Sequence, residues 1–131
     1  MSQENVELIR RVIDAINRRD RQTLLSFMDE KVEVESRIVS MEGPLRGHEG
    51  IDRWWHEWFN SFPDYQVEIV EVQDFGDVLL TALRAVGHGA GSGVPFEDNV
   101  WHASRWRAVK CVWWRNFVRR EAALEAAGLS E

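Results

Sequence analysis

The side chains best suited to chemistry lie in one aromatic stretch, residues 100–117, which holds four of the seven Trp residues. Its two halves are rich in aromatic and β-branched residues and are separated by Ala108 and Val109, which predicts two paired antiparallel strands. Because side chains alternate along a strand, every second residue shares a face. One face of this predicted pair would carry Val100, His102, Ser104 and Trp106 from the first strand, and Val112, Trp114, Asn116 and Val118 from the second.

His102 is the candidate catalytic residue of this face. An imidazole titrates near neutral pH, so His102 could act as a general acid or base or could hydrogen-bond a ligand. The competing interpretation is a core histidine bonded to Ser104 or to a neighbouring strand, because one His without a partner carboxylate specifies no chemistry. Glu35 and Asp98 are the carboxylates that could complete an acid/base pair.

Candidate ligand-binding residues surround this histidine. Asn116 has no titratable proton near neutral pH, but its amide could orient a ligand by hydrogen bonds. Ser104 is a second polar group on the same predicted face. The aromatic residues Trp54, Trp58, Trp106 and Trp114 could form a wall for a flat apolar ligand, or they could simply fill the core.

No metal or cofactor site is predicted. His48 and His56 lie at the start and on the flank of a predicted helix, and neither has a second ligand at metal spacing. The glycine-rich run 87–93 is too irregular for a phosphate-binding fingerprint and does not connect a strand to a helix.

Length and charge narrow the class of protein. A chain of 131 residues fits a single domain, residues 1–131, and its net charge of -6 opposes a phosphate-binding surface and hence nucleic acid. The one cysteine, Cys111, is predicted to be a buried thiol, which fits a reducing cytoplasm. Residues 1–5 are polar and acidic, unlike a signal peptide, and no apolar run is long enough to span a membrane.

The elements that position these residues follow from hydrophobic periodicity. Apolar residues recur at helical spacing over residues 4–18, and Asp20 is the predicted N-cap of a short second helix that reaches Met28. A strand over residues 32–39 ends before Gly43-Pro44, and an aromatic helix over 51–62 follows. The rest alternates as strands at 65–75 (with a bulge near Val70), 78–88, 94–107 and 110–118, then a short helix at 121–127. This order predicts an α+β fold with helices packed on one side of a curved antiparallel sheet.

Three segments carry a resemblance to a known family. Gly47-His48-Glu49-Gly50-Ile51 opens the Trp-rich helix, Phe62-Pro63-Asp64-Tyr65 closes it, and the last strand runs into Glu121–Leu129. The chain resembles the SnoaL-like polyketide cyclase branch of the nuclear-transport-factor-2-like superfamily. This resemblance implies a cone with N-terminal helices on the concave side of the sheet, a ligand cavity, and a homodimer formed through the outer sheet face.

The resemblance also assigns residues. His102 matches the acid/base histidine of the polyketide cyclases, but Asn116 occupies the position of their aspartate, which weakens a cyclase assignment. The only tyrosine, Tyr65, lies outside the first helix, where ketosteroid isomerases place theirs. Asp98, Arg105 and Arg115 do not alternate onto one face, as an epoxide hydrolase arrangement would require.

Three functions are therefore expected from the sequence. The leading one is binding of a small, largely apolar molecule in the cone cavity. The second is a cofactor-independent lyase, isomerase, cyclase or hydrolase that uses His102 as general acid/base. The third is a non-catalytic structural or interaction module whose cavity is plugged by its own Trp residues.

Overall fold

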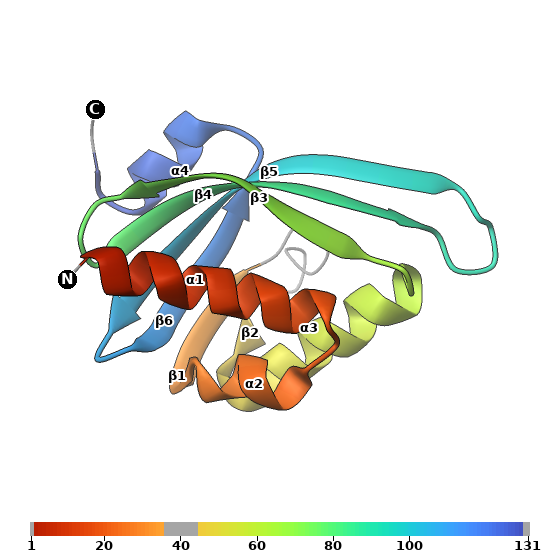
Figure 1. The fold of residues 1–131 in the computed structure, drawn as a ribbon, viewed down its shortest axis with the longest axis horizontal. Coiled ribbons are helices and arrows are strands. Elements are labelled where there is room, and N and C mark those ends of the chain that lie inside the picture. Colours follow the sequence, from red (N-terminus) through yellow and green to blue (C-terminus); the bar gives the residue numbers. More distant parts are fainter. Residues whose placement is uncertain (1, 36–44, 130–131) are drawn as a thin grey trace.

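The computed structural model describes residues 2–35 and 45–129, which form four helices and six strands (Figure 1). The helices are α1 (Ser2–Asn17), α2 (Arg21–Ser26), α3 (Gly47–Ser61) and α4 (Arg120–Ala126). The strands are β1 (Met28–Glu35), β2 (Leu45–Arg46), β3 (Gln66–Asp74), β4 (Val78–His88), β5 (Pro95–Arg107) and β6 (Lys110–Phe117).

One curved sheet contains all six strands in the order β2-β1-β6-β5-β4-β3. The four strands from β3 to β6 form the predicted antiparallel meander, and β1 adds to it parallel to β6. The predicted bulge in β3 is confirmed, because the register with β4 shifts between Ile69 and Glu71 and leaves Val70 exposed. The mixed α+β fold expected from the sequence is confirmed.

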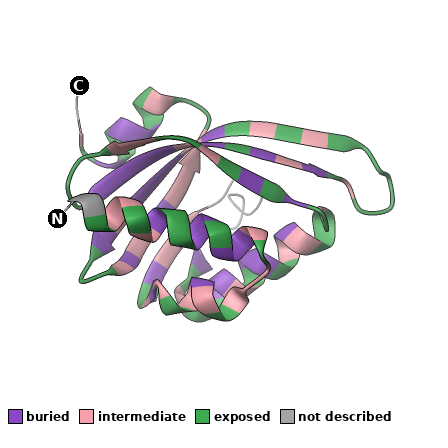
Figure 2. Cartoon of the chain, in the orientation of Figure 1, coloured by how far each residue is buried: buried purple, intermediate pink, exposed green. Residues whose placement is uncertain are grey.

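The N-terminal helices cover the concave side of the sheet, as predicted. α1 lies against β3, and α3 lies against β1 and β2 (Figure 1). α3 buries its aromatic stripe, including Trp54, Trp55 and Trp58, because the stripe faces the sheet. Figure 2 shows buried positions concentrated on the strands behind α1, whereas the far end of the β4–β5 hairpin is mostly exposed.

The predicted end of the second helix at Met28 and the predicted start of the following strand at residue 32 are both wrong, although the predicted N-cap is confirmed. Asp20 does cap α2, with its carboxylate accepting a hydrogen bond from the Thr23 backbone N–H at 3.1 Å. The helix nevertheless ends at Ser26, and Met28 begins β1, where it is buried opposite Cys111. The predicted continuation of this strand to residue 39 and its break at Gly43-Pro44 lie outside the described residues.

The predicted alternation holds along β5 but is broken in β6. Val100, His102, Ser104 and Trp106 are all buried on the concave side. The register between β5 and β6 shifts between Arg105 and Trp106, so Trp106 pairs with Cys111. Cys111 therefore joins the core, and the expectation that Val112 shares the face of Trp114 is wrong. Val118 lies beyond the end of β6 and is exposed.

The convex side of the sheet carries the terminal helix. Ala123 and Leu124 of α4 pack on Leu80 and Ala103, in a cluster separate from the main core. Gly128 follows with φ of 74°, a left-handed conformation that ends the helix where the sequence predicts. Among residues 2–35 and 45–129, no helix is long and apolar enough to cross a membrane.

Candidate functional site

His102 lies in the middle of a row that crosses three strands on the concave side. It pairs in register with Thr81 on β4 and with Asn116 on β6. Directly opposed residues of antiparallel strands project to the same face, so the three side chains point into the same interior. His102 has only 1% of its surface exposed and Thr81 has none, so these two side chains are closed off from bulk solvent, whereas Asn116 is half-buried.

The surroundings of His102 are apolar. Its ring stands edge-on to the Trp114 indole, with centroids 4.9 Å apart and planes at 86°. Both ring nitrogens are buried, and no described residue hydrogen-bonds either of them. This burial lowers the pKa of His102 to about 3, because the charged imidazolium would be poorly solvated. The imidazole is therefore neutral at neutral pH.

Thr81 is a site residue that the sequence reasoning missed. It sits on the inner face of β4 between Leu79 and Leu83, and its Oγ1 is buried with no partner among the described side chains and backbone. The available signal was a lone hydroxyl on an otherwise apolar strand face. Burying such a group without a hydrogen bond is unfavourable, so its position is informative.

α3 contributes the tryptophans Trp54 and Trp58. Trp54 packs edge-on against Trp114, with centroids 4.9 Å apart, so it lies next to the indole that contacts His102. Trp58 belongs instead to a second aromatic cluster with Phe62, Tyr65 and Phe96. The Nε1 atoms of both Trp54 and Trp58 are buried and find no acceptor in the described part of the chain.

The remaining predicted site residues, Ser104, Trp106, Trp114 and Asn116, hydrogen-bond one another in pairs. The indole Nε1 of Trp106 donates to Ser104 Oγ at 2.9 Å, so Ser104 bonds to this tryptophan rather than to His102. The Trp114 Nε1 donates a long hydrogen bond of 3.4 Å to Asn116 Oδ1. Trp106 and Ser104 thus form a self-contained piece of core beside the row.

Neither candidate carboxylate hydrogen-bonds His102. Glu35 follows the buried Val34 and shares the convex side with Glu33, whose carboxylate contacts Arg115 at 2.8 Å and Arg46 at 3.6 Å. Asp98 lies four residues before His102 on β5, about 13 Å along the strand. The structure therefore does not bring a predicted acid/base pair together.

Metal-binding geometry is also absent from the described residues, in which no three His, Cys, Asp or Glu side chains are grouped to hold an ion. His48 Nε2 instead lies 3.0 Å from the Met28 carbonyl oxygen. The Cys111 thiol is buried, and this burial raises its pKa to about 12. Such a thiol is a poor nucleophile because little thiolate forms near neutral pH.

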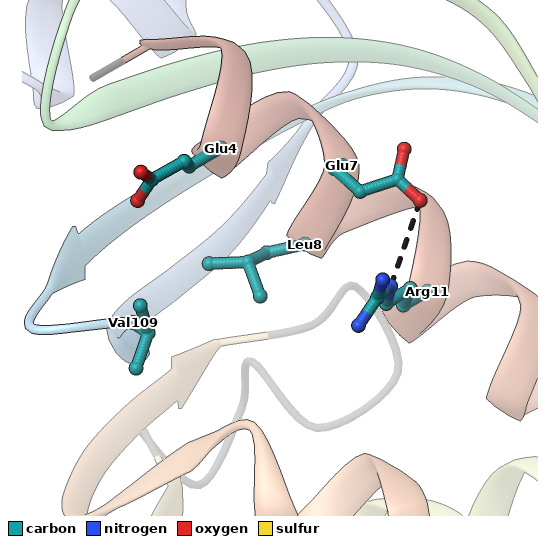
Figure 3. A pocket seen from close by; sticks show the side chains of 5 residues that line it. All are labelled: Glu4, Glu7, Leu8, Arg11 and Val109. Atoms are coloured by element: carbon teal, nitrogen blue, oxygen red, sulfur yellow. Dashed lines mark ion pairs between the residues drawn. The ribbon is translucent and has the colours of Figure 1, made fainter.

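Three surface hollows lie away from His102. One of about 450 Å³ separates α1 from the β5–β6 turn and is lined by Glu4, Glu7, Leu8, Arg11 and Val109 (Figure 3). Its rim holds an exposed ion pair with Arg11 Nε 3.5 Å from Glu7 Oε1. A second lies beside His48 and Lys110, and a third lies on the convex side next to Trp113.

Comparison with known proteins gives one matching family and many solved structures with the same fold. The family model described as a SnoaL-like domain matches residues 9–116. No curated protein matches the chain.

Similar solved structures cover nearly the whole chain. A putative SnoaL-like polyketide cyclase from Jannaschia sp. CCS1 is 18% identical, with a TM-score of 0.79 over 99% of this chain and 95% of its own. An NTF2-like protein from Burkholderia xenovorans LB400 is 22% identical, with a TM-score of 0.75 over 96% and 97%. TerC, crystallised with polyporic acid, is 19% identical, with a TM-score of 0.77 over 93% and 96%. At these identities the likeness establishes the fold and not the activity.

Proposed function

Because the chain belongs to the SnoaL-like domain family, we propose that it binds a small, largely apolar molecule between α3 and the concave face of β4, β5 and β6. The observation that carries this proposal is a set of buried hydrogen-bonding atoms without partners among the described residues. On the concave side the set consists of Trp54 Nε1, Trp58 Nε1, Thr81 Oγ1 and both ring nitrogens of His102, while the Nε atoms of Arg105 and Arg115 are the convex-side members.

Folded proteins rarely leave such atoms unpaired, because an unpaired buried group is energetically costly. An unsatisfied buried donor or acceptor costs about 1–3 kcal/mol, and most buried polar groups in native proteins have a partner. Several unpaired groups on facing elements of one interior are therefore expected where a ligand completes the hydrogen bonds. TerC, which shares this fold, has been crystallised with the organic molecule polyporic acid, so a ligand of this kind is compatible with the architecture.

The groups also define the chemistry of the ligand. An indole N–H only donates, so Trp54 and Trp58 require acceptor atoms such as carbonyl or hydroxyl oxygens. Thr81 and a neutral His102 can each donate and accept. The buried polar residues among those described are Thr81, His102 and Ser104, so no buried charge is available to pair with a charged ligand. An uncharged molecule with an apolar body and oxygen atoms fits best.

His102 serves in this proposal as a hydrogen-bonding group. A base whose pKa is about 3 has little affinity for a proton at neutral pH, which disfavours general base catalysis. The rival function, a cofactor-independent lyase, isomerase, cyclase or hydrolase, requires the bound substrate to raise this pKa. Unchanged turnover of an identified substrate by His102→Gln would exclude that rival.

A second candidate function follows from how tightly the interior is closed. His102, Trp54 and Trp114 have 1%, 2% and 3% of their surface exposed, respectively, so a ligand must displace packed side chains to reach them. These values favour the alternative of a non-catalytic module plugged by its own tryptophans.

A matched pair of probes separates the two candidates. 2-Acetonaphthone and 2-naphthoate have similar size and differ in charge, so binding in the interior should raise the midpoint of thermal unfolding only with the ketone. At a ligand concentration of 100 Kd the stabilisation is about 2.7 kcal/mol. Thr81→Val should abolish the shift and Thr81→Ser should retain it. No shift with either probe, or an equal shift with both, would count against the ligand site.

Two further expectations accompany this function. We expect the protein to be cytoplasmic and to form a homodimer through its sheet. Light scattering coupled to size-exclusion chromatography tests the oligomeric state, and a mass of 15.3 kDa would identify a monomer.

A further inference from the structure

Positive charge gathers in one hollow on the convex side of the sheet, behind the strands that carry His102 and Trp114. The hollow has a volume of about 460 Å³ and lies beside the β5–β6 turn. Its charged lining consists of Lys31 from β1, Arg105 and Arg107 from β5, Lys110 from β6, and Asp29. Four cations thus face one carboxylate in a chain whose net charge is -6.

Two of these cations have no ion pair with any described residue. Lys31 and Arg107 are exposed and reach the hollow from different strands. Lys110 is partly engaged, because its Nζ donates to the Ser26 carbonyl oxygen at 2.5 Å. A surface that collects unpaired cations in an acidic protein favours an anion, since repulsion among like charges is otherwise uncompensated.

Arg105 lines the hollow and is held in place by two contacts. Its Nη2 donates to the Ala127 carbonyl oxygen at 3.2 Å, and its guanidinium lies 5.6 Å from the centre of the Trp113 ring. The nearest carboxylate oxygen, from Asp77, is 3.7 Å from Nε, which is too far for a hydrogen bond. A fixed guanidinium binds oxyanions well because its planar N–H groups match their geometry.

We propose that this hollow binds a small, multiply charged oxyanion, either a phosphate compound or a polycarboxylate. The volume lies in the range of small-molecule sites, which is about 300–1,000 Å³. An extended nucleic acid is disfavoured, since the rest of the chain carries a net charge of -9, obtained from -6 by removing the local +3. This site is separate from the interior site and does not depend on it.

Calorimetric titration of the full chain with sodium pyrophosphate and with sodium citrate tests the proposal. We expect saturable binding of at least one anion at low ionic strength, and its identity tells phosphate chemistry from carboxylate chemistry. The double variant Lys31→Gln/Arg107→Gln should weaken binding by about tenfold or more, because each charged hydrogen bond lost contributes substantially. Both substituted side chains are exposed, so the fold should be retained.

The matched control removes the same charge elsewhere. Arg10 is an exposed residue of α1, and Arg119 precedes α4 with an exposed, long ion pair to Glu121 of 3.8 Å. Arg10→Gln/Arg119→Gln should change the affinity by less than about twofold, because distant exposed charges are screened. The absence of saturable binding to both anions, or an equal loss in the two double variants, would overturn the proposal.

Discussion

The imidazole of His102 on β5 stands perpendicular to the indole of Trp114 on β6, with ring centroids 4.9 Å apart. Trp114 in turn meets Trp54 of α3 edge-on at the same separation, so one indole joins the sheet row to the helix. This contact surrounds the histidine with carbon atoms rather than with a carboxylate. The consequence is a neutral, poorly basic imidazole, which sets both its chemistry and its effect on stability.

The first prediction concerns the dependence of stability on pH. The pKa of His102 in the folded protein is about 3, below the ordinary value of 6.5, so the unfolded state binds this proton first as pH falls. The contribution of His102 is therefore fully present above pH 6.5 and is lost between pH 6.5 and pH 3. The slope is about 1.4 kcal/mol per pH unit, or roughly 2–3 kcal/mol by pH 4.5.

Urea unfolding of the protein and of His102→Leu from pH 4.5 to pH 8 measures this term. The free energy of unfolding of the natural chain minus that of His102→Leu should fall by roughly 2–3 kcal/mol between pH 8 and pH 4.5, because only the natural chain loses the histidine term. His88→Gln is the matched control, since His88 is exposed and lies beside Asp64 at 2.7 Å. A difference that stays constant with pH would show that His102 is protonated equally in both states.

The second prediction concerns the orphaned hydroxyl of Thr81. Thr81→Val replaces a buried oxygen that has no partner among the described residues by a methyl group of similar shape. Removing an unsatisfied group should stabilise the ligand-free protein by about 1 kcal/mol. Thr23→Val should do the opposite, because Thr23 Oγ1 bonds Asp20 Oδ2 at 2.6 Å beside the start of α2. Equal destabilisation of both variants in chemical denaturation would mean that Thr81 is satisfied.

The sequence predicts those features of this molecule that depend on neighbouring residues, and it does not predict those that depend on how distant segments pair. The α3 stripe and the alternation of β5 are local patterns, so they predicted Trp54, Trp58 and His102 on the concave side. The inward position of Cys111 depends on a register shift between two strands, which no local pattern encodes. Likewise, the pairing of Trp106 with Ser104, which removes Ser104 as a partner for His102, depends on side-chain conformation. The burial of these side chains was therefore predictable, while the hydrogen bonds around them were not, and their role in a ligand site stays a prediction.

The third prediction concerns the pair Trp54 and Trp114. Edge-to-face aromatic pairs contribute about 0.5–1.5 kcal/mol beyond the area that they bury. A double-mutant cycle with Trp54→Leu and Trp114→Leu isolates this coupling, because each single variant removes the same contact. Trp55→Leu serves as the comparison partner for Trp114, since Trp55 packs on Phe59 and Trp54 and has no ring contact with Trp114 among the described residues. Coupling of the same size in both cycles would indicate general loosening of the core.

The last prediction concerns the turn that joins β5 to β6. Ala108 and Val109 both have positive φ, 48° and 60°, which a type I′ hairpin requires and which a β-branched residue adopts at a cost. Val109 is 54% exposed, so its side chain offers little burial in compensation. Val109→Gly should therefore stabilise the protein by about 1–2 kcal/mol, because glycine adopts this conformation freely. Val94→Gly, at a valine that is 61% exposed and has no positive φ, should give no gain or a small loss. Thermal unfolding of the two variants measures the contrast. Destabilisation by Val109→Gly would show that the Val109 side chain, which lines the hollow beside α1, stabilises the turn by more than its positive φ costs.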